Sequence, residues 1–223
     1  MTADAPPSQG GAQRSLSADR YGRAGATATK VTPQLVKLRQ YALMEVTLRR
    51  PRFEDWERVH EWTSTIDACR FQTWGPNTPA DTRAFVEAAV DSWKVADDER
   101  RRYVWAAEHE DMSVVGLGEL HVTDPVNRQG DISYSVHTEL WGRGFARAIA
   151  NELLRFGFEE QRLHRIVGTC DPRNVASEKV LRSAGMTYEG RARHTLLLRD
   201  GWRDSQLFSV LENEWLRSER QRS

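Results

Sequence analysis

Gly142, Arg143, Gly144 and Arg147 form the group of residues whose types and spacing best suit chemistry with a ligand. Glycine lets the main chain come close to a bound molecule, because it has no side chain. The two arginines add positive charge beside the same turn. If a helix starts directly after Gly144, the group predicts an anion site, most naturally for a phosphate or a pyrophosphate.

The residues around the turn predict the strand and the helix that such a site needs. Residues 131–137 alternate polar and apolar side chains, which is the period of a half-buried strand. The first N–H groups of a following helix would lack internal acceptors, and its dipole would add partial positive charge. Many glycine turns bind nothing, so this segment alone leaves a ligand site and a purely structural turn equally open. The helix itself is predicted by one apolar stripe of Phe145, Ile149, Leu153 and Phe156.

Composition limits the class of protein. The 223 residues suffice for one domain and an extension, and 32 Lys+Arg balance 32 Asp+Glu. Balanced charge gives no support for a nucleic-acid partner, and no apolar run is long enough for a membrane span. There is no secretory signal pattern at the start. Cys69 and Cys170 lie far apart and the six His are scattered, so we expect no metal and a reduced, cytoplasmic setting.

The chain is expected to divide into an extension and one folded domain. Residues 1–30 are rich in small and polar residues and should be disordered, because they lack the apolar surface that offsets the entropy of ordering. Residues 31–44 should form a short helix or a linker. The domain is expected over residues 45–217, with a flexible tail at 218–223.

Within the domain, the patterns predict an α+β fold. A helix is expected to start at Pro51, and another over 79–97 should bury Phe85, Ala88, Ala89 and Trp93. The strand at 165–170 is entered from a helix, so it should lie parallel to the strand at 130–137. Asn174 can cap a helix over 175–184, which Gly185 ends. Further strands are expected at 45–50, 103–108, 114–122, 186–198 and 202–212.

Short motifs over residues 46–216 together resemble the GNAT acetyltransferase superfamily, and most closely its branch of ribosomal-protein N-terminal alanine acetyltransferases, the RimJ/RimL type. Each motif is short, but their order and spacing are specific. They are Leu48-Arg49-Arg50-Pro51, Gly116-x-Gly118-Glu119-Leu120-His121, Ile132-Ser133-Tyr134, Trp141-Gly142-Arg143-Gly144-Phe145-Ala146, Phe158-Glu159, Asn174-Val175-Ala176-Ser177, Val180-Leu181, Ala184-Gly185-Met186, Glu189-Gly190, Asp200-Gly201 and Glu214-Trp215.

The resemblance implies a mixed, mostly antiparallel twisted sheet with helices on both faces and a splayed central strand pair. It also implies acetyl-CoA as the donor of an acetyl group and an amine as its acceptor. Trp141 stands where the superfamily usually has Gln or Arg, as is frequent in this branch. Pantetheine would lie along Ser135, Val136 and His137, and the pyrophosphate would contact main-chain N–H groups of Trp141, Gly142, Arg143, Gly144, Phe145, Ala146 and Arg147.

Asn174 and Ser177 take roles from the same resemblance. It puts the Asn174 amide on the pantetheine arm and the Ser177 hydroxyl near the sulfur, where it could protonate the leaving thiolate. Many family members use a tyrosine one turn later, but Leu181 stands there, which favours Ser177. An ordinary helix cap and first-turn serine would explain both residues without a ligand. Possible contacts of the 3′-phosphate are Lys179, Arg173 and Arg182.

Glu119 is the first choice for the general base that takes the proton of the ammonium group, acting through water. Gly116 and Gly118 are expected to leave room around it, although a cross-strand ion pair would explain this glutamate equally well. The glutamate proposed as base in the branch corresponds to about Leu196 here, so that role does not transfer. His137 and His194 are the fallback bases. A buried thiol is the expected state of Cys170, so direct transfer in a ternary complex is favoured over a covalent acetyl-enzyme.

Two other classes of protein use similar features. A dinucleotide-binding oxidoreductase fits poorly, because the third glycine of its motif falls on Arg147. A CoA-binding regulator without catalysis stays open. Among acceptors, a protein N-terminus or a small-molecule primary amine ranks first, an antibiotic amine is an alternative, and a histone-like lysine tail ranks lower. A homodimer is a further expectation from the resemblance.

Overall fold

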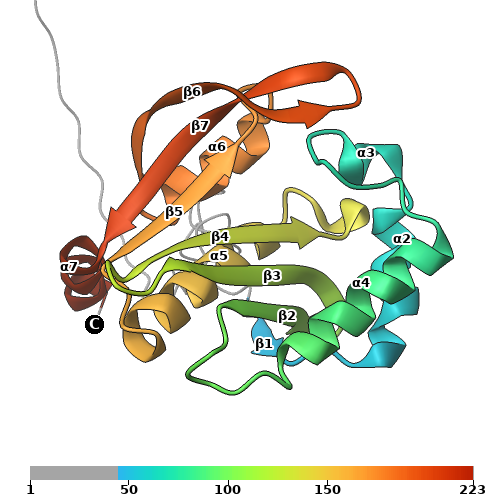
Figure 1. Cartoon of the computed structure of the whole chain (residues 1–223), viewed down its shortest axis with the longest axis horizontal. Helices are drawn as coiled ribbons and strands as arrows, with labels where there is room; N and C mark the ends of the chain where they lie inside the picture. Colours follow the sequence, from blue (N-terminus) through green and yellow to red (C-terminus); the bar gives the residue numbers. More distant parts are fainter. Residues whose placement is uncertain (1–44, 223) are drawn as a thin grey trace, which may run out of the picture.

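The computed structural model describes residues 45–222, and the predictions for residues 1–44 lie outside that range. The described part contains one seven-stranded sheet in the order β1-β2-β3-β4-β5-β7-β6 (Figure 1). All neighbours are antiparallel except β4 and β5, which run parallel as predicted. The strands are β1 Thr47–Arg49, β2 Arg102–His109, β3 Ser113–Asp124, β4 Gln129–Val136, β5 Arg165–Cys170, β6 Thr187–Leu198 and β7 Gly201–Leu211.

Helices cover both faces of this sheet. On one face, α5 packs on β3 and β4, and α6 packs on β5. On the opposite face, α4 packs on β2 and α2 packs on β3. The helix α7 was not predicted. The α-helices are α2 Trp56–Thr63, α3 Ile66–Cys69, α4 Pro79–Ser92, α5 Phe145–Arg155, α6 Val175–Ser183 and α7 Glu212–Arg222, and short helical turns occur at Phe53–Asp55, Thr138–Leu140 and Phe156–Glu160.

The N-terminal helices differ in detail from the prediction. Regular helix starts at Trp56 rather than at Pro51, after a turn at Phe53–Asp55. The helix α4 begins with a capping box of Thr78 and Asp81 and ends at Ser92 instead of residue 97. The end has a physical reason: buried Arg100 donates hydrogen bonds to carbonyls at the end of the helix, those of Ser92 and Trp93.

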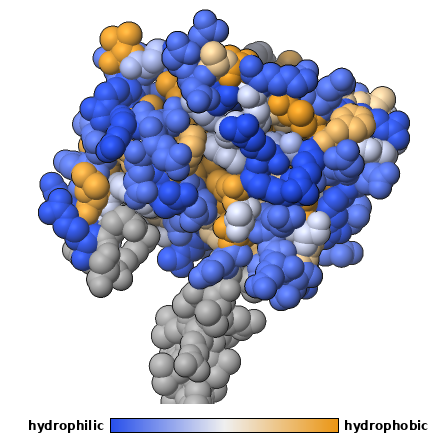
Figure 2. Space-filling view, turned by 90° about the horizontal axis from the view of Figure 1, so that it is seen from below, coloured by the Kyte–Doolittle hydropathy of each residue, from blue (hydrophilic) through white to orange (hydrophobic). Residues whose placement is uncertain are grey.

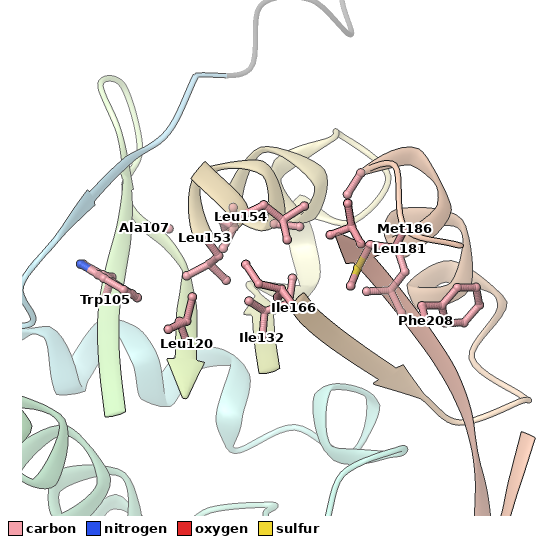
Figure 3. Packing of buried hydrophobic residues seen from close by; sticks show 14 of the residues in the cluster. Trp105, Ala107, Leu120, Ile132, Leu153, Leu154, Ile166, Leu181, Met186 and Phe208 are labelled. Carbon is pink, nitrogen blue, oxygen red and sulfur yellow. The ribbon is translucent and has the colours of Figure 1, made fainter. Parts of the chain in front are cut away.

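The prediction of which α4 residues are buried was also partly wrong. Ala88 is exposed, and the buried residues of the helix are Thr82, Val86 and Ala89. Alternation along β2 explains why two cores exist. Val104 and Ala106 point to the α2 and α4 side, and Ala106 packs there with Val59, Trp62 and Val86. On the α5 and α6 side, the packed residues include Trp105, Ala107, Leu120, Ile132, Leu153, Leu154, Ile166, Leu181, Met186 and Phe208 (Figure 3).

Gly116 and Gly118 have a different purpose from the one predicted. A Cβ on Gly118 would lie 2.9 Å from Ile149, and one on Gly116 would lie 2.3 Å from the carbonyl oxygen of Ser135. Because both glycines face α5, they allow that helix to pack closely on β3, and Gly116 also leaves room for the main chain of β4. They do not leave room around Glu119, whose side chain lies on the opposite face.

β4 and β5 separate after a short pairing. Their register covers only Gln129–Asp131 against Arg165–Val167, and Figure 1 shows the two strands diverging beyond it. From Ile132 onward β4 pairs with β3 alone, while β5 continues along β7. This confirms the splayed central pair, and it leaves main-chain groups on one edge of β4 available to a ligand.

The face in Figure 2 is mostly hydrophilic, with apolar residues in small separate groups. In residues 45–222, no helix combines the length and apolar character needed to cross a bilayer.

Glu189 ties three strands together at the far edge of the sheet, and this predicts a pH effect. Its carboxylate accepts hydrogen bonds from Arg165 and Ser209, and chiefly the Arg165 bond lowers its pKa from 4.5 to about 2. A depressed folded-state pKa stabilises the fold above the unfolded value, and that contribution disappears as the pH falls toward 2. Glu189→Gln should therefore lower the free energy of unfolding at neutral pH by about 1 kcal/mol or less, since the pair is partly exposed.

Urea unfolding of both proteins at neutral pH and near pH 3 checks this. The difference between wild type and Glu189→Gln should shrink at the acid pH. An equal difference at both pH values would show that the ion pair does not titrate as described.

Candidate active site

The glycine turn has the geometry of an anion site. Gly142 has a φ of 75° and Gly144 a φ of 96°, values in the left-handed region that glycine adopts without cost. Gly144 is the N-cap of α5, and no side chain caps that helix. Its first N–H groups are therefore open to a ligand. A Cβ on Gly142 would meet nothing within 4 Å, so the space above the turn is free.

Trp141 anchors the turn to the strand before it. Its indole N–H donates a hydrogen bond of 2.9 Å to the carbonyl of Val136, although about half of the residue is exposed. Next to it, Arg143 and Arg147 are exposed and form no ion pair with any described residue. The turn thus combines fixed main-chain geometry with two unpaired positive side chains.

His137 is fully engaged inside the protein. Its Nδ1 accepts from the N–H of Glu139, so Nε2 carries the proton and donates to Glu61 at 3.1 Å. Its main-chain N–H donates to Val115, and its carbonyl accepts from Leu140. The residue shapes the start of the turn, and it presents neither a free donor to a cofactor nor a free base to an amine.

Tyr134 and Ser177 meet across the gap between β4 and α6. The tyrosine hydroxyl lies 3.1 Å from Ser177 Oγ. Burial raises the pKa of Tyr134 well above its usual value, so the phenol stays protonated. The sequence gave Tyr134 a place in a strand and in a short family motif but no catalytic role, and only the fold brings it to Ser177.

Asn174 holds the first turn of α6. Its Oδ1 accepts a hydrogen bond of 3.0 Å from the N–H of Ser177, which confirms the predicted cap. The amide nitrogen of Asn174 has no acceptor among the described residues, so it remains a donor for a ligand.

Because the oxygen of Asn174 caps the helix and its amide nitrogen has no acceptor in residues 45–222, two substitutions of this residue should have different outcomes. Asn174→Ala should cost about 1 kcal/mol of stability, because it removes the cap. Asn174→Asp should keep the cap, since a carboxylate oxygen also accepts. Both should weaken CoA binding, because both lose the amide donor. Thermal unfolding and calorimetric titration with CoA check this, and wild-type CoA affinity in Asn174→Asp would contradict the assignment.

A cavity of about 580 Å³ opens beside the splayed strands. Glu119 on β3 and Asp81 at the start of α4 give it two carboxylates. Hydrogen bonds from the hydroxyl and N–H of Thr78 lower the pKa of Asp81. A pocket with carboxylates and aromatic faces suits a positively charged amine. Its other lining residues include Thr63, Gln72, Trp74, Asn77, Phe85, Ser133, Tyr134 and Ser135.

Glu119 is both a cavity residue and half of an ion pair. Arg102 Nε lies 2.6 Å from Glu119 Oε1, and its Nη2 lies 3.1 Å from Oε2. The structure therefore contains the cross-strand ion pair and also places Glu119 in the cavity, while its role as general base stays a prediction. The other fallback base, His194, stacks on Trp202 and lines a different cleft.

The three residues predicted to contact the 3′-phosphate differ in whether they already form an ion pair. Arg173 pairs with Asp171 and Asp200, and Arg182 pairs with Glu178. In contrast, Lys179 is exposed and has no ion-pair partner within residues 45–222, so it is the best placed of the three for a phosphate.

The surroundings of Leu181 and Cys170 agree with the chemistry expected at these two positions. Leu181 is buried and packs so closely on Gly168 that a Cβ there would lie 2.7 Å from its Cδ2; no hydroxyl reaches the site from that position. Burial raises the pKa of Cys170 to about 11, which makes it a poor nucleophile. Residues 45–222 contain no cluster of side chains suited to a metal ion.

Comparison with known proteins agrees with this geometry. The family model for the acetyltransferase (GNAT) domain matches residues 45–187. The N-acetyltransferase YnaD of Bacillus subtilis is 28% identical over 75% of this chain and 94% of its own. The putative ribosomal N-acetyltransferase YdaF of the same organism is 30% identical over 61% of this chain and 74% of its own.

Solved structures share the fold. A GNAT-family acetyltransferase from Bacillus anthracis has a TM-score of 0.67 and 28% identity, covering 76% of this chain and 96% of its own. Spermidine N-acetyltransferase from Vibrio cholerae, in complex with CoA and spermine, has a TM-score of 0.66 and 18% identity, covering 77% and 98%. The family match over most of the domain, joined to the glycine turn and the splayed strands, shows that this chain belongs to the GNAT family and is an acetyl-CoA-dependent acetyltransferase.

Proposed function

We propose that the protein transfers the acetyl group of acetyl-CoA to a primary amine, on a small molecule or a protein N-terminus, directly within a ternary complex. The observation that carries this proposal is the convergence of two groups at the splayed strands. On one side lies the hydroxyl pair of Tyr134 and Ser177, and on the other a cavity with the carboxylates of Glu119 and Asp81. A proton donor and an ammonium-binding pocket at one point suit amine acylation.

The donor side of the proposed site uses main-chain groups. N–H groups at Trp141, Gly142, Arg143, Gly144, Phe145, Ala146 and Arg147 would bind the diphosphate, with charge from the two arginines. The main-chain N–H of Val136, on the free edge of β4 beside Ser135, would bind the pantetheine arm, and Asn174 would donate its amide to the same arm. Lys179 would contact the 3′-phosphate.

The proposed reaction forms a bond from the amine nitrogen to the acetyl carbon and breaks the carbon–sulfur bond. Glu119 takes the excess proton of the ammonium group through water, so that a neutral amine attacks. Ser177 gives its hydroxyl proton to the leaving thiolate. The attacking nitrogen loses its second proton as the amide forms, and that proton passes through the hydroxyl of Tyr134 to Ser177, so both hydroxyls end protonated. An N–H on the free edge of β4 stabilises the oxyanion.

The acceptor class rests on the cavity and on the relatives. Two carboxylates with Trp74 and Phe85 favour a cationic amine over a neutral one. Relatives of this chain include a spermidine N(1)-acetyltransferase of Escherichia coli and the putative ribosomal N-acetyltransferase YdaF. The domain limits 45–217, a homodimer and a cytoplasmic location remain predictions.

Free-thiol release from acetyl-CoA with a panel of acceptors tests the proposed function. The panel holds spermidine, a peptide with N-terminal alanine, an aminoglycoside and a lysine-tail peptide with a blocked N-terminus. We expect one or more of the first three to raise thiol release far above hydrolysis, and the lysine-tail peptide to do so least. Tight CoA binding without acceleration by any amine would contradict it.

The role of Glu119 predicts a pH-dependent defect. Glu119→Gln should lower kcat by about a hundredfold at neutral pH and recover at high pH, where the amine is already neutral. Arg102→Gln breaks the same ion pair but keeps the carboxylate, so it should retain most activity. Rates of thiol release measured across pH check both variants. If Glu119→Gln and Arg102→Gln lost the same fraction of activity at every pH, Glu119 would contribute only through the ion pair and not as a base.

A further inference from the structure

A second cleft of about 310 Å³ lies where β5 leads into α6 and the β6–β7 hairpin begins to turn. It is separate from the acceptor cavity, but the loop between α3 and α4 touches both. Trp74 of that loop lines the cavity, and Phe71 packs against the guanidinium of Arg173 at 5.7 Å. Arg173 in turn lines the second cleft.

Arg203 is the unusual residue of this cleft. Only 9% of the residue is exposed, and no carboxylate lies within ion-pair distance of it among the described residues. Nη2 donates to Ser205 at 3.2 Å, whereas the buried Nε has no hydrogen-bond acceptor. A buried guanidinium without a direct ion-pair partner is costly, and such groups are normally paired.

The carboxylates of the cleft are already taken by other arginines. Asp171 and Asp200 pair with Arg173, and Asp204 pairs with Arg191. The three arginines and three aspartates of the cleft balance in number, yet their geometry leaves Arg203 unpaired. An external anion could provide the ion-pair partner that Arg203 lacks within the described residues.

We propose that this cleft binds the carboxylate of a small molecule. The guanidinium of Arg203 lines the cleft, and such a planar group matches a carboxylate. A single negative charge fits one unpaired guanidinium, whereas a phosphate dianion would face three aspartates. Trp202, which is 60% exposed and stacks with His194, gives the cleft a flat wall for an apolar or aromatic body.

Binding of para-fluorobenzoate, followed by fluorine NMR on the full chain without acetyl-CoA, tests this. Wild type should bind the probe saturably, and Arg203→Gln should bind it at least about tenfold more weakly, because charge-assisted hydrogen bonds are lost. Arg203→Lys should also weaken binding, because lysine lacks the fork. The matched control is Arg193→Gln, which removes an exposed arginine of β6 and should bind as wild type does.

Two further probes define the chemistry. Neutral para-fluorobenzamide should not bind, and para-fluorophenyl phosphate should bind more weakly than the benzoate. Thermal unfolding confirms that each variant is folded. Equal benzoate affinity in the folded Arg203 variants, no saturable binding in wild type, or tighter binding of the phosphate would overturn the proposal.

The carboxylate could belong to the amine acceptor or to a separate molecule, and kinetics distinguishes these sources. Para-(aminomethyl)benzoate and benzylamine differ only in the carboxylate. If the acceptor carries it, Arg203→Gln should raise KM for the first amine alone. If a separate molecule carries it, the KM of both amines should stay unchanged while benzoate binding is lost. The binding measurement needs no turnover, so its failure is distinguishable from failure of the proposed acetyl transfer.

Discussion

Gly142→Ala is expected to weaken CoA binding by about tenfold or more while the domain stays folded. An L-residue in the left-handed conformation costs about 1–2 kcal/mol, and Gly142 has a φ of 75°. The turn can relieve this strain only by changing its dihedral angles, which turns its N–H groups away from the diphosphate. A Cβ would also enter the open space above the turn. Calorimetric titration with CoA measures the loss.

Gly185→Ala is the matched control for that variant. Gly185 has a φ of 88°, and a Cβ there would likewise meet nothing within 4 Å. Both substitutions should therefore lower the thermal stability by a similar amount. Only the one in the glycine turn should affect CoA. If both variants bind CoA equally well, the turn does not hold the diphosphate.

Ser177→Ala is expected to lower kcat by about 10²–10⁴-fold, the usual range for loss of a proton donor. CoA affinity should stay close to that of wild type, because the cap made by Asn174 uses the main-chain N–H of residue 177. Tyr134→Phe should lower kcat less, since water can return the proton to Ser177. Steady-state rates with a saturating amine measure both effects.

The double variant separates a relay from two independent contributions. If Tyr134 acts through Ser177, Tyr134→Phe should add little to Ser177→Ala, because residues that act as a unit are not additive. Ser183→Ala is the control: this exposed serine of α6 bonds only to the carbonyl of Val180. A kcat of Ser177→Ala within about twofold of wild type would rule out the proton-donor role.

Local patterns explain why much of the fold could be predicted. Alternation gave the strands near their observed limits, and the change of period at Gly144 gave the start of α5. The crossover rule gave the parallel pairing of β4 and β5. Helix ends failed where a distant side chain decided them, as when Arg100 ends α4.

The site was harder to predict, because its contacts join residues far apart in the chain. Tyr134 and Ser177 are 43 positions apart, and a tyrosine in an alternating strand predicts packing as readily as chemistry. The pair of Arg102 and Glu119 depends on the register of β2 and β3. Nothing in the sequence around Arg203 predicts that it lacks an ion-pair partner in the described part of the chain. That lack arises because the neighbouring aspartates pair with Arg173 and Arg191 in the fold.

The acceptor cavity shows the same division. Trp74, from the loop between α3 and α4, lines the cavity. The position of that loop is set by Arg199, which donates to the carbonyls of Cys69 and Trp74 from the distant hairpin turn. Periodicity within one segment carries no information about such a contact.

The most direct measurement is a crystal structure of the protein with CoA. The central claim requires diphosphate oxygens within hydrogen-bond distance of the N–H groups between Gly142 and Arg147. It also requires the sulfur beside Ser177 Oγ in the gap between β4 and β5. CoA bound elsewhere, or a sulfur remote from Ser177 with the turn's N–H groups directed into the protein, would contradict it.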